Sequence, residues 1–194
     1  MIRARGLGRS FGRKRVLRDL DLEVGERDLL LVTGANGSGK STLLALCAGL
    51  LAPTAGELEV VVERGRIGYL AHEPLVYREL TALENLDLYG RLYRVPERRE
   101  RIGMLLERFG LWDARRRPVS SFSRGMQQRL ALCRTLLHEP DLLLLDEPYA
   151  GLDEAGAELL DAELRSLAGK RALLLATHDP ARVASLASGR LALP

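Results

Sequence analysis

Long hydrophobic runs are missing from this chain of 194 residues. The longest, residues 43–52, holds about ten residues, whereas a membrane-spanning helix needs about 20. The amino terminus carries arginines and no apolar stretch of the kind found in secretory signals. We therefore expect a chain that stays in the cytoplasm and does not itself cross a membrane.

Cysteine is also scarce, since the chain contains only Cys47 and Cys133. The two lie in apolar surroundings and form no CxxC pair, so we expect buried thiols rather than a cysteine-bound metal. The net charge of +3 is a small excess over many balanced charges. It does not indicate a nucleic-acid partner, and we predict none.

Side-chain amides are the third scarcity, because the chain has only Asn36, Asn85, Gln127 and Gln128. Poverty in amides is typical of heat-adapted proteins, and it limits which residues are available for chemistry. The remaining composition, with 46% hydrophobic and 28% charged residues, is that of an ordinary globular protein. The length predicts one domain, or one domain with an inserted subdomain.

Apolar patterning predicts strands that alternate with helices, which indicates an α/β fold. We expect strands over residues 2–7, 20–24, 29–33, 58–62, 67–70, 142–145 and 171–176. We expect helices over residues 43–51, 82–94, 96–109, 125–137 and 154–168. The arginine-rich helical block in the middle interrupts the strand pattern, as an inserted subdomain would.

A glycine-rich loop follows the strand at residues 29–33 and matches the pattern G-x-x-x-x-G-K-[ST]. Glycines allow backbone N–H groups to converge on phosphate oxygens, and the helix that follows directs its positive end at the same anion. Lys40 is expected to reach the β- and γ-phosphates, and Ser41 to bind Mg²⁺. The predicted phosphate-binding residues are Gly34, Asn36, Gly37, Ser38, Gly39, Lys40, Ser41 and Thr42.

Two carboxylates complete this candidate site. The leucine-rich strand at residues 142–145 delivers Asp146 to its carboxyl end, where it can hold Mg²⁺ directly or through water. Glu147 follows at once and is positioned to polarise an attacking water as a general base. With Lys40 and Ser41, these residues predict hydrolysis of a nucleoside triphosphate.

A third motif, at residues 121–129, precedes that strand and contains Ser123 and Gly125. Together with Asp146-Glu147-Pro148, the loop at residues 150–153 and His178, it resembles the ATP-binding cassette (ABC) family over essentially the whole chain. In that family the signature binds the γ-phosphate of ATP that the opposite subunit holds. The resemblance therefore implies two chains, or this chain and a similar ATPase subunit, that meet head to tail around ATP.

The same resemblance assigns further roles. His178 matches the histidine that contacts the γ-phosphate and assists Glu147, and Asp153 matches the loop that crosses the dimer interface. Phe11 matches the aromatic residue that stacks on adenine, with Val16 close by. The implied fold is an α/β, P-loop NTPase core with a mainly parallel sheet, an N-terminal antiparallel β subdomain and an inserted α-helical subdomain. Residues 1–71 and 139–194 form the expected core, and residues 72–138 the helical signature subdomain.

The sequence departs from the family pattern in two places. Phe122, Arg124 and Met126 replace the usual signature residues, and Arg124 adds a cation beside the expected polyphosphate. The family also places a glutamine where the core joins the helical subdomain, and none is found there in this chain. His72 occupies the corresponding place, and we expect it near the metal, with Glu73 next to it.

The resemblance implies an ATPase subunit that powers separate integral membrane subunits and is attached to the inner face of the cell membrane. Within the family, the signature and the segment 80–86 look most like the haem-exporter subunit of cytochrome c maturation. A drug or lipid efflux subunit is the alternative. A soluble cassette ATPase that acts on ribosomes or DNA, and a metabolic P-loop kinase, fit less well, because the former usually carries two cassettes and the latter would not explain the signature.

Overall fold

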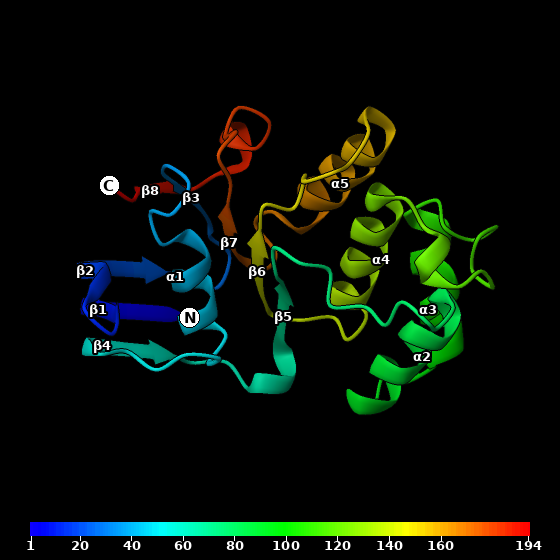
Figure 1. The fold of residues 1–194 in the computed structure, drawn as a ribbon, viewed down its shortest axis with the longest axis horizontal. Coiled ribbons are helices and arrows are strands. Elements are labelled where there is room, and N and C mark those ends of the chain that lie inside the picture. Colours follow the sequence, from blue (N-terminus) through cyan, green and yellow to red (C-terminus); the bar gives the residue numbers. More distant parts are fainter.

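An antiparallel sheet forms one side of the structure (Figure 1). The computed structural model describes residues 1–194. The sheet has the order β2-β1-β4 and consists of β1 (Ile2–Phe11), β2 (Lys14–Val24) and β4 (Ala55–Val60). β2 begins six residues earlier than expected, because its polar first half pairs with β1 at the sheet edge, where charged residues face solvent. β4 overlaps the predicted 58–62 segment, but it begins before residue 58 and ends at Val60.

A parallel five-stranded sheet lies next to it, in the order β5-β6-β7-β3-β8. Its strands are β3 (Leu29–Thr33), β5 (Ile67–Leu70), β6 (Leu142–Asp146), β7 (Ala172–Ala176) and β8 (Gly189–Ala192). All four pairings are parallel, as expected for strands whose connections contain helices. β8 was not predicted, because its four residues carry little apolar pattern and it forms by pairing with β3.

Helices cover both faces of the parallel sheet. α1 (Lys40–Cys47) lies between the two sheets, while α4 (Arg124–Leu136) and α5 (Glu154–Leu167) lie on the opposite face (Figure 1). α2 (Ala82–Leu92) and α3 (Arg98–Arg108) lie beyond α4. Single 3-10 turns complete the structure at Arg64–Arg66, Val119–Ser121 and Ala184–Leu186. None of the helices combines the length and the apolar character that a transmembrane segment requires.

Local sequence explains where three of these helices begin. Thr81 and Glu84 form a capping box at the start of α2, in which each side chain bonds the backbone N–H of the other. Ser123 caps α4, and Asp153 caps α5 by accepting from the N–H of Gly156 at 2.9 Å. Two of these caps, Ser123 and Asp153, are also residues that the sequence assigned to the dimer interface.

Alternating side chains of the parallel strands feed two separate cores. Leu143 and Leu145 of β6 pack toward the helices α2–α5, whereas Leu142 and Leu144 pack toward α1 and the antiparallel sheet. Because successive side chains of a strand point to opposite faces, Asp146 continues the second series and faces α1. The carboxylate therefore reaches the side of the sheet on which the glycine-rich loop lies. These features confirm the predicted α/β class with one mainly parallel and one antiparallel sheet.

Candidate functional site

The glycine-rich loop joins β3 to α1 and depends on its glycines. Gly39 has φ +103°, and a Cβ atom there would lie 2.8 Å from the Leu17 side chain of β2. Gly34 is equally confined, since its Cβ would lie 2.6 Å from Ser38 Oγ and 2.7 Å from the Leu193 carbonyl oxygen. A side chain at either position would fill or distort the cradle. The loop therefore keeps its backbone open toward a ligand at the start of α1.

Lys40 holds a positive charge inside this loop. Its Nζ donates hydrogen bonds to the carbonyl oxygens of Gly34 at 2.8 Å and Ala35 at 3.1 Å, and lies 4.0 Å from Glu147 Oε1. The residue is only 6% exposed. A buried ammonium group beside the N-terminus of α1 makes the loop an anion site, and this fits the phosphates of a nucleotide.

Asp146 is the most buried carboxylate of the site, with 1% of its surface exposed. Neither of its side-chain oxygens has a hydrogen-bond partner. Burial raises the pKa of Asp146, against smaller opposing effects of the nearby Ser41 and Lys40. A buried carboxylate that lacks partners and lies beside a serine hydroxyl fits Mg²⁺, because this cation prefers oxygen ligands. Ser41 and Asp146 are therefore the residues that would hold the metal.

Glu147 lies between the loop lysine and His178. Its Oε2 accepts from the backbone N–H of His178 at 3.3 Å and lies 2.8 Å from His178 Nδ1. Glu147 has φ +47°, an uncommon left-handed conformation for a residue with a side chain. This bend follows directly after β6, and its N–H bonds the Ala176 carbonyl at the end of β7. The ends of two neighbouring strands thus bring the carboxylate and the imidazole together.

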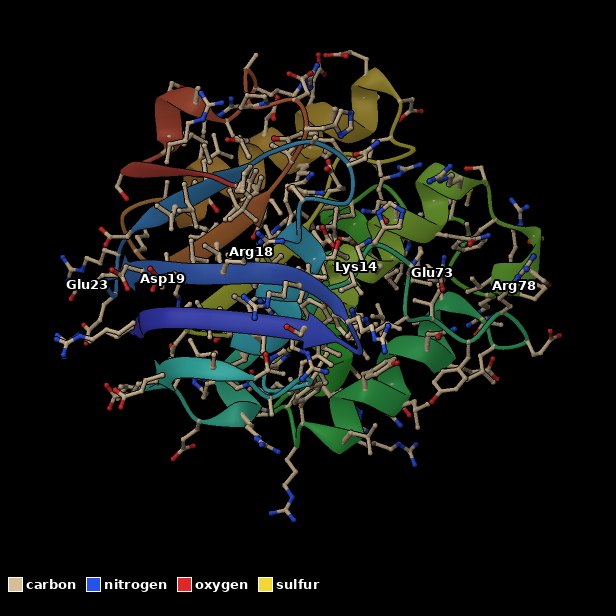
Figure 2. The ribbon with its side chains drawn as sticks, turned by 60° about the vertical axis from the view of Figure 1, so that its left-hand side comes forward. Lys14, Arg18, Asp19, Glu23, Glu73 and Arg78 are labelled. Atoms are coloured by element: carbon tan, nitrogen blue, oxygen red, sulfur yellow. The ribbon has the colours of Figure 1, made fainter.

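A cleft of about 380 Å³ contains most of the predicted phosphate and metal residues. Its lining residues are Lys14, Val16, Asn36, Gly37, Gly39, Lys40, Ser41, Thr42, His72, Asp146 and Glu147. His72 is exposed and close enough to favour the ionised form of Asp146. Lys14 was not predicted. Figure 2 shows it at the end of β2 that lies toward the helical part, with Glu73 beyond it on the segment after β5.

Several predicted residues lie outside this cleft. Phe11 is 45% exposed, and the Arg9 guanidinium lies 4.6 Å from its ring centre. Asp153 and His178 line a neighbouring cavity of about 350 Å³, which Glu147 shares. Gly34 and Ser38 belong to the glycine-rich loop but do not line the cleft, and Ser38 Oγ is buried without a hydrogen-bond partner.

The signature segment packs against the loop that precedes α5. A Cβ atom on Gly125 would lie 2.8 Å from the Gly151 carbonyl oxygen, so the two backbones are in direct contact. Gln128 adds a buried link, because its Nε2 donates to the Pro148 carbonyl at 3.1 Å. Ser123 Oγ accepts from the Met126 N–H at 3.2 Å. The signature is thereby fixed to the segment after Glu147 but does not reach the cleft of its own chain.

Comparison with known proteins gives a family. The profile described as ABC transporter matches residues 17–150. The uncharacterized ABC transporter ATP-binding protein YxlF of Bacillus subtilis (strain 168) is 38% identical over 185 residues, which cover 92% of this chain and 62% of YxlF. The daunorubicin resistance ATP-binding protein DrrA3 of Streptomyces coeruleorubidus is 42% identical over 184 residues, which cover 89% and 58%. The bacitracin transport ATP-binding protein BcrA of Bacillus licheniformis is 34% identical over 180 residues, which cover 88% and 58%. The chain spans less than two thirds of the length of these three relatives.

Solved structures share the fold. The structure of an ATP binding subunit of an ABC transporter matches with a TM-score of 0.91 at 27% identity, covering 99% of this chain and 85% of that one. A dimeric ATP-binding cassette in a post-hydrolysis state, bound to ADP and Pi, matches with a TM-score of 0.88 at 28% identity, covering 100% and 94%. The family profile, the relatives and these structures agree with the geometry of the loop and the two carboxylates, and the chain belongs to the ABC transporter family as an ATP-binding cassette.

Proposed function

We propose that the chain binds ATP with Mg²⁺ and hydrolyses it to ADP and phosphate. The observation that carries this proposal is that Glu147, at the end of β6, lies 4.0 Å from Lys40 of α1 and 2.8 Å from His178, which follows β7. It places a phosphate-binding cation, a carboxylate and an imidazole within one chain of contacts. The match to a cassette structure that holds ADP and Pi supports the same reaction.

Each residue has a separate task in this proposal. Lys40 leaves the Gly34 and Ala35 carbonyls and binds the β- and γ-phosphates. Glu147 takes the proton of the attacking water, while His178 orients the carboxylate through Nδ1. Bound at Ser41 and Asp146, the metal ion would neutralise part of the phosphate charge.

The adenine and metal contacts extend this assignment. We infer that Phe11 and Val16 contact the base, since both lie near the turn between β1 and β2, and Val16 lines the cleft. His72 takes the place of the missing glutamine, as its position in the cleft beside Asp146 supports. Residues 1–71 and 139–194 act as the ATP-binding core, with residues 72–138 as the signature subdomain.

A second cassette completes the site. Ser123, Gly125 and Asp153 lie outside the cleft of their own chain, which is what an arrangement in trans requires. Head-to-tail pairing with a second copy, or with a similar subunit, would place the signature of each chain over the γ-phosphate of the other. The dimeric form of a related cassette structure supports this pairing.

The cassette is proposed to drive export through integral membrane subunits at the inner face of the cell membrane. DrrA3 and BcrA are described as daunorubicin resistance and bacitracin transport proteins, so export of drug-like or antibiotic compounds is our proposal for this chain. The haem export expected from the signature is described for neither relative. We propose the segment at residues 80–86 as the contact with the membrane partner, because it resembles the region where family members receive a helix of the membrane subunit.

The test is Glu147→Gln in the purified chain. We expect this variant to bind ATP with an affinity close to wild type, to hydrolyse it at least about a hundredfold more slowly, and to accumulate as an ATP-dependent dimer. Glu107→Gln is the matched control, because it removes an exposed carboxylate on α3, outside the cleft, and should leave the rate unchanged. Hydrolysis at the wild-type rate in Glu147→Gln would contradict the assigned role.

A further inference from the structure

Arg182 gathers three partners on the outer side of the cavity that contains His178. Its Nη2 donates to Glu154 Oε1 at 2.6 Å and its Nη1 to Asp161 Oδ2 at 3.2 Å. Its guanidinium lies 5.7 Å from the ring centre of Tyr149, whose hydroxyl donates to Asp161 Oδ1 at 2.6 Å. We call Tyr149, Glu154, Asp161 and Arg182 the Arg182 cluster.

The cluster holds the far end of the loop that carries His178. This loop leaves β7 at Thr177, and the Thr177 side chain bonds the N–H and carbonyl of Asp179. Near its beginning the loop is tied to Glu147 through His178. Four residues later, Arg182 ties it to α5. The short span 178–182 is therefore tied at both ends, to Glu147 through His178 and to α5 through Arg182.

The same cluster reaches the loop that is expected at the dimer interface. Glu154 is the first residue of α5 and follows Asp153, which caps the helix. Tyr149 belongs to the segment between Glu147 and Asp153, and the cavity of about 350 Å³ lies between this segment and the His178 loop. Arg182 thus joins two loops that the sequence separates by more than 20 residues.

The strength of these contacts favours a role in geometry. An isolated ion pair at the surface contributes little to stability, whereas a guanidinium that donates to two carboxylates fixes their relative positions. The side chain of Arg182 is 33% exposed and that of Asp161 is 18% exposed, so solvent competes only partly for the bond between them, whereas Glu154 is 72% exposed and its bond is open to solvent. Carboxylates on both sides raise the pKa of Arg182, and the charge is permanent.

We propose that Arg182 is a positioning residue, which ties the His178 loop to α5 and thereby keeps His178 Nδ1 at hydrogen-bond distance from Glu147 Oε2. This role rests on the proposed function, because it acts on hydrolysis at this site.

The test compares Arg182→Gln with Arg182→Lys and with Arg108→Gln. Lysine can keep one of the two carboxylate contacts and should restore part of the activity. Arg108 of α3 pairs at 3.0 Å with Glu163, which lies on α5 as Glu154 and Asp161 do. This pair lies away from His178 and serves as the control. The readouts are kcat and KM for ATP, together with the melting temperature.

For Arg182→Gln we expect kcat to fall by about tenfold or more, because a small misplacement of a catalytic group is costly. KM should change by less than about twofold, and the melting temperature should be no lower than that of Arg108→Gln, which leaves the buried Glu163 without its partner. Equal kcat in Arg182→Gln and Arg108→Gln would overturn the proposal. So would a loss of activity that follows only a lowered melting temperature.

A second measurement separates this proposal from the proposed function. Amide hydrogen exchange of residues 177–183 should be faster in Arg182→Gln than in the control, whether or not the protein hydrolyses ATP. If Arg182→Gln shows faster exchange but wild type shows no hydrolysis that depends on Glu147, the proposed function fails while the tie between the loops stands. Unchanged exchange in Arg182→Gln would overturn the tie itself.

Discussion

Asp146→Asn should make the nucleotide-free protein more stable and should weaken the binding of Mg²⁺ with ATP. Asp146 is 1% exposed and both of its carboxylate oxygens lack a hydrogen-bond partner. An unsatisfied buried polar group costs about 1–3 kcal/mol, and a charged group costs more. The amide that replaces it keeps unpaired hydrogens, so we expect a net gain in the free energy of unfolding of about 1–2 kcal/mol. For a chain of this size that corresponds to a rise in melting temperature of about 2–8 °C.

The pH dependence of this gain follows from the direction of the shift. Burial raises the pKa of Asp146, so the folded state resists ionisation more than the unfolded chain does. The cost is fully present above the raised pKa and disappears below the ordinary range of an aspartate, where both states are protonated. Melting temperatures of Asp146→Asn and wild type should therefore differ at pH 7 and converge in acid.

The assay is thermal unfolding in EDTA, with ATP and EDTA, and with ATP and Mg²⁺. A ligand at about 100 times its Kd stabilises the folded state by about 2.7 kcal/mol, and we expect Asp146→Asn to lose the part of this shift that needs the metal. Asp113→Asn, which changes an exposed carboxylate, should alter stability by less than about 0.5 kcal/mol. A lower melting temperature of Asp146→Asn in EDTA would refute the reasoning, because it would mean that the carboxylate is well partnered.

Three further predictions follow from other contacts. Gly125→Ala should weaken ATP-driven dimerisation by about tenfold or more, because its Cβ would press on the Gly151 carbonyl. Gly103→Ala is the control, since a Cβ there has ordinary van der Waals room. Gel filtration in ATP measures the dimer of each variant, and equal amounts of dimer would contradict the packing argument. Burial lowers the pKa of His138, so the unfolded chain is protonated at a higher pH than the folded protein and stability falls as pH drops from about 7 to 5. His138→Phe should flatten this dependence of the unfolding free energy on pH, as measured by urea titrations. An unchanged slope would exclude His138 as its source. Arg124→Gln removes an unpaired cation at the start of α4. The variant should weaken dimerisation in ATP several-fold at low salt but little at high salt, because salt screens the charge. An effect independent of salt would rule out an electrostatic cause.

Much of the nucleotide cleft was predictable because its residues form continuous motifs. The loop around Lys40 and the pair Asp146-Glu147 each follow a strand with a strong apolar pattern, and the parallel sheet then brings the strand ends together. His178 was assigned by resemblance to the family, and it lies two residues after β7 and beside Glu147, in the neighbouring cavity. In each case the chemistry-bearing residues and the element that positions them are neighbours in the sequence.

The parts that escaped prediction depend on contacts between distant segments. β8 and the first half of β2 are strands because β3 and β1 lie beside them, and their own residues show no clear apolar alternation. Lys14 enters the cleft only because β2 begins early. Gln128 and Arg182 resembled ordinary helix and surface residues, and their partners Pro148 and Asp161 lie about 20 residues away in the chain. No local pattern records such pairs.

The position of Lys40 has a consequence for the rate at which nucleotide enters. Its ammonium group donates hydrogen bonds to the Gly34 and Ala35 carbonyls, and these bonds hold the conformation of the loop in the free protein. The incoming phosphate therefore does not need to fold the loop and has only to exchange two hydrogen bonds of one side chain. Nucleotide association should be fast and limited by diffusion into the cleft, which leaves the slow steps of a turnover to the meeting and separation of the two cassettes.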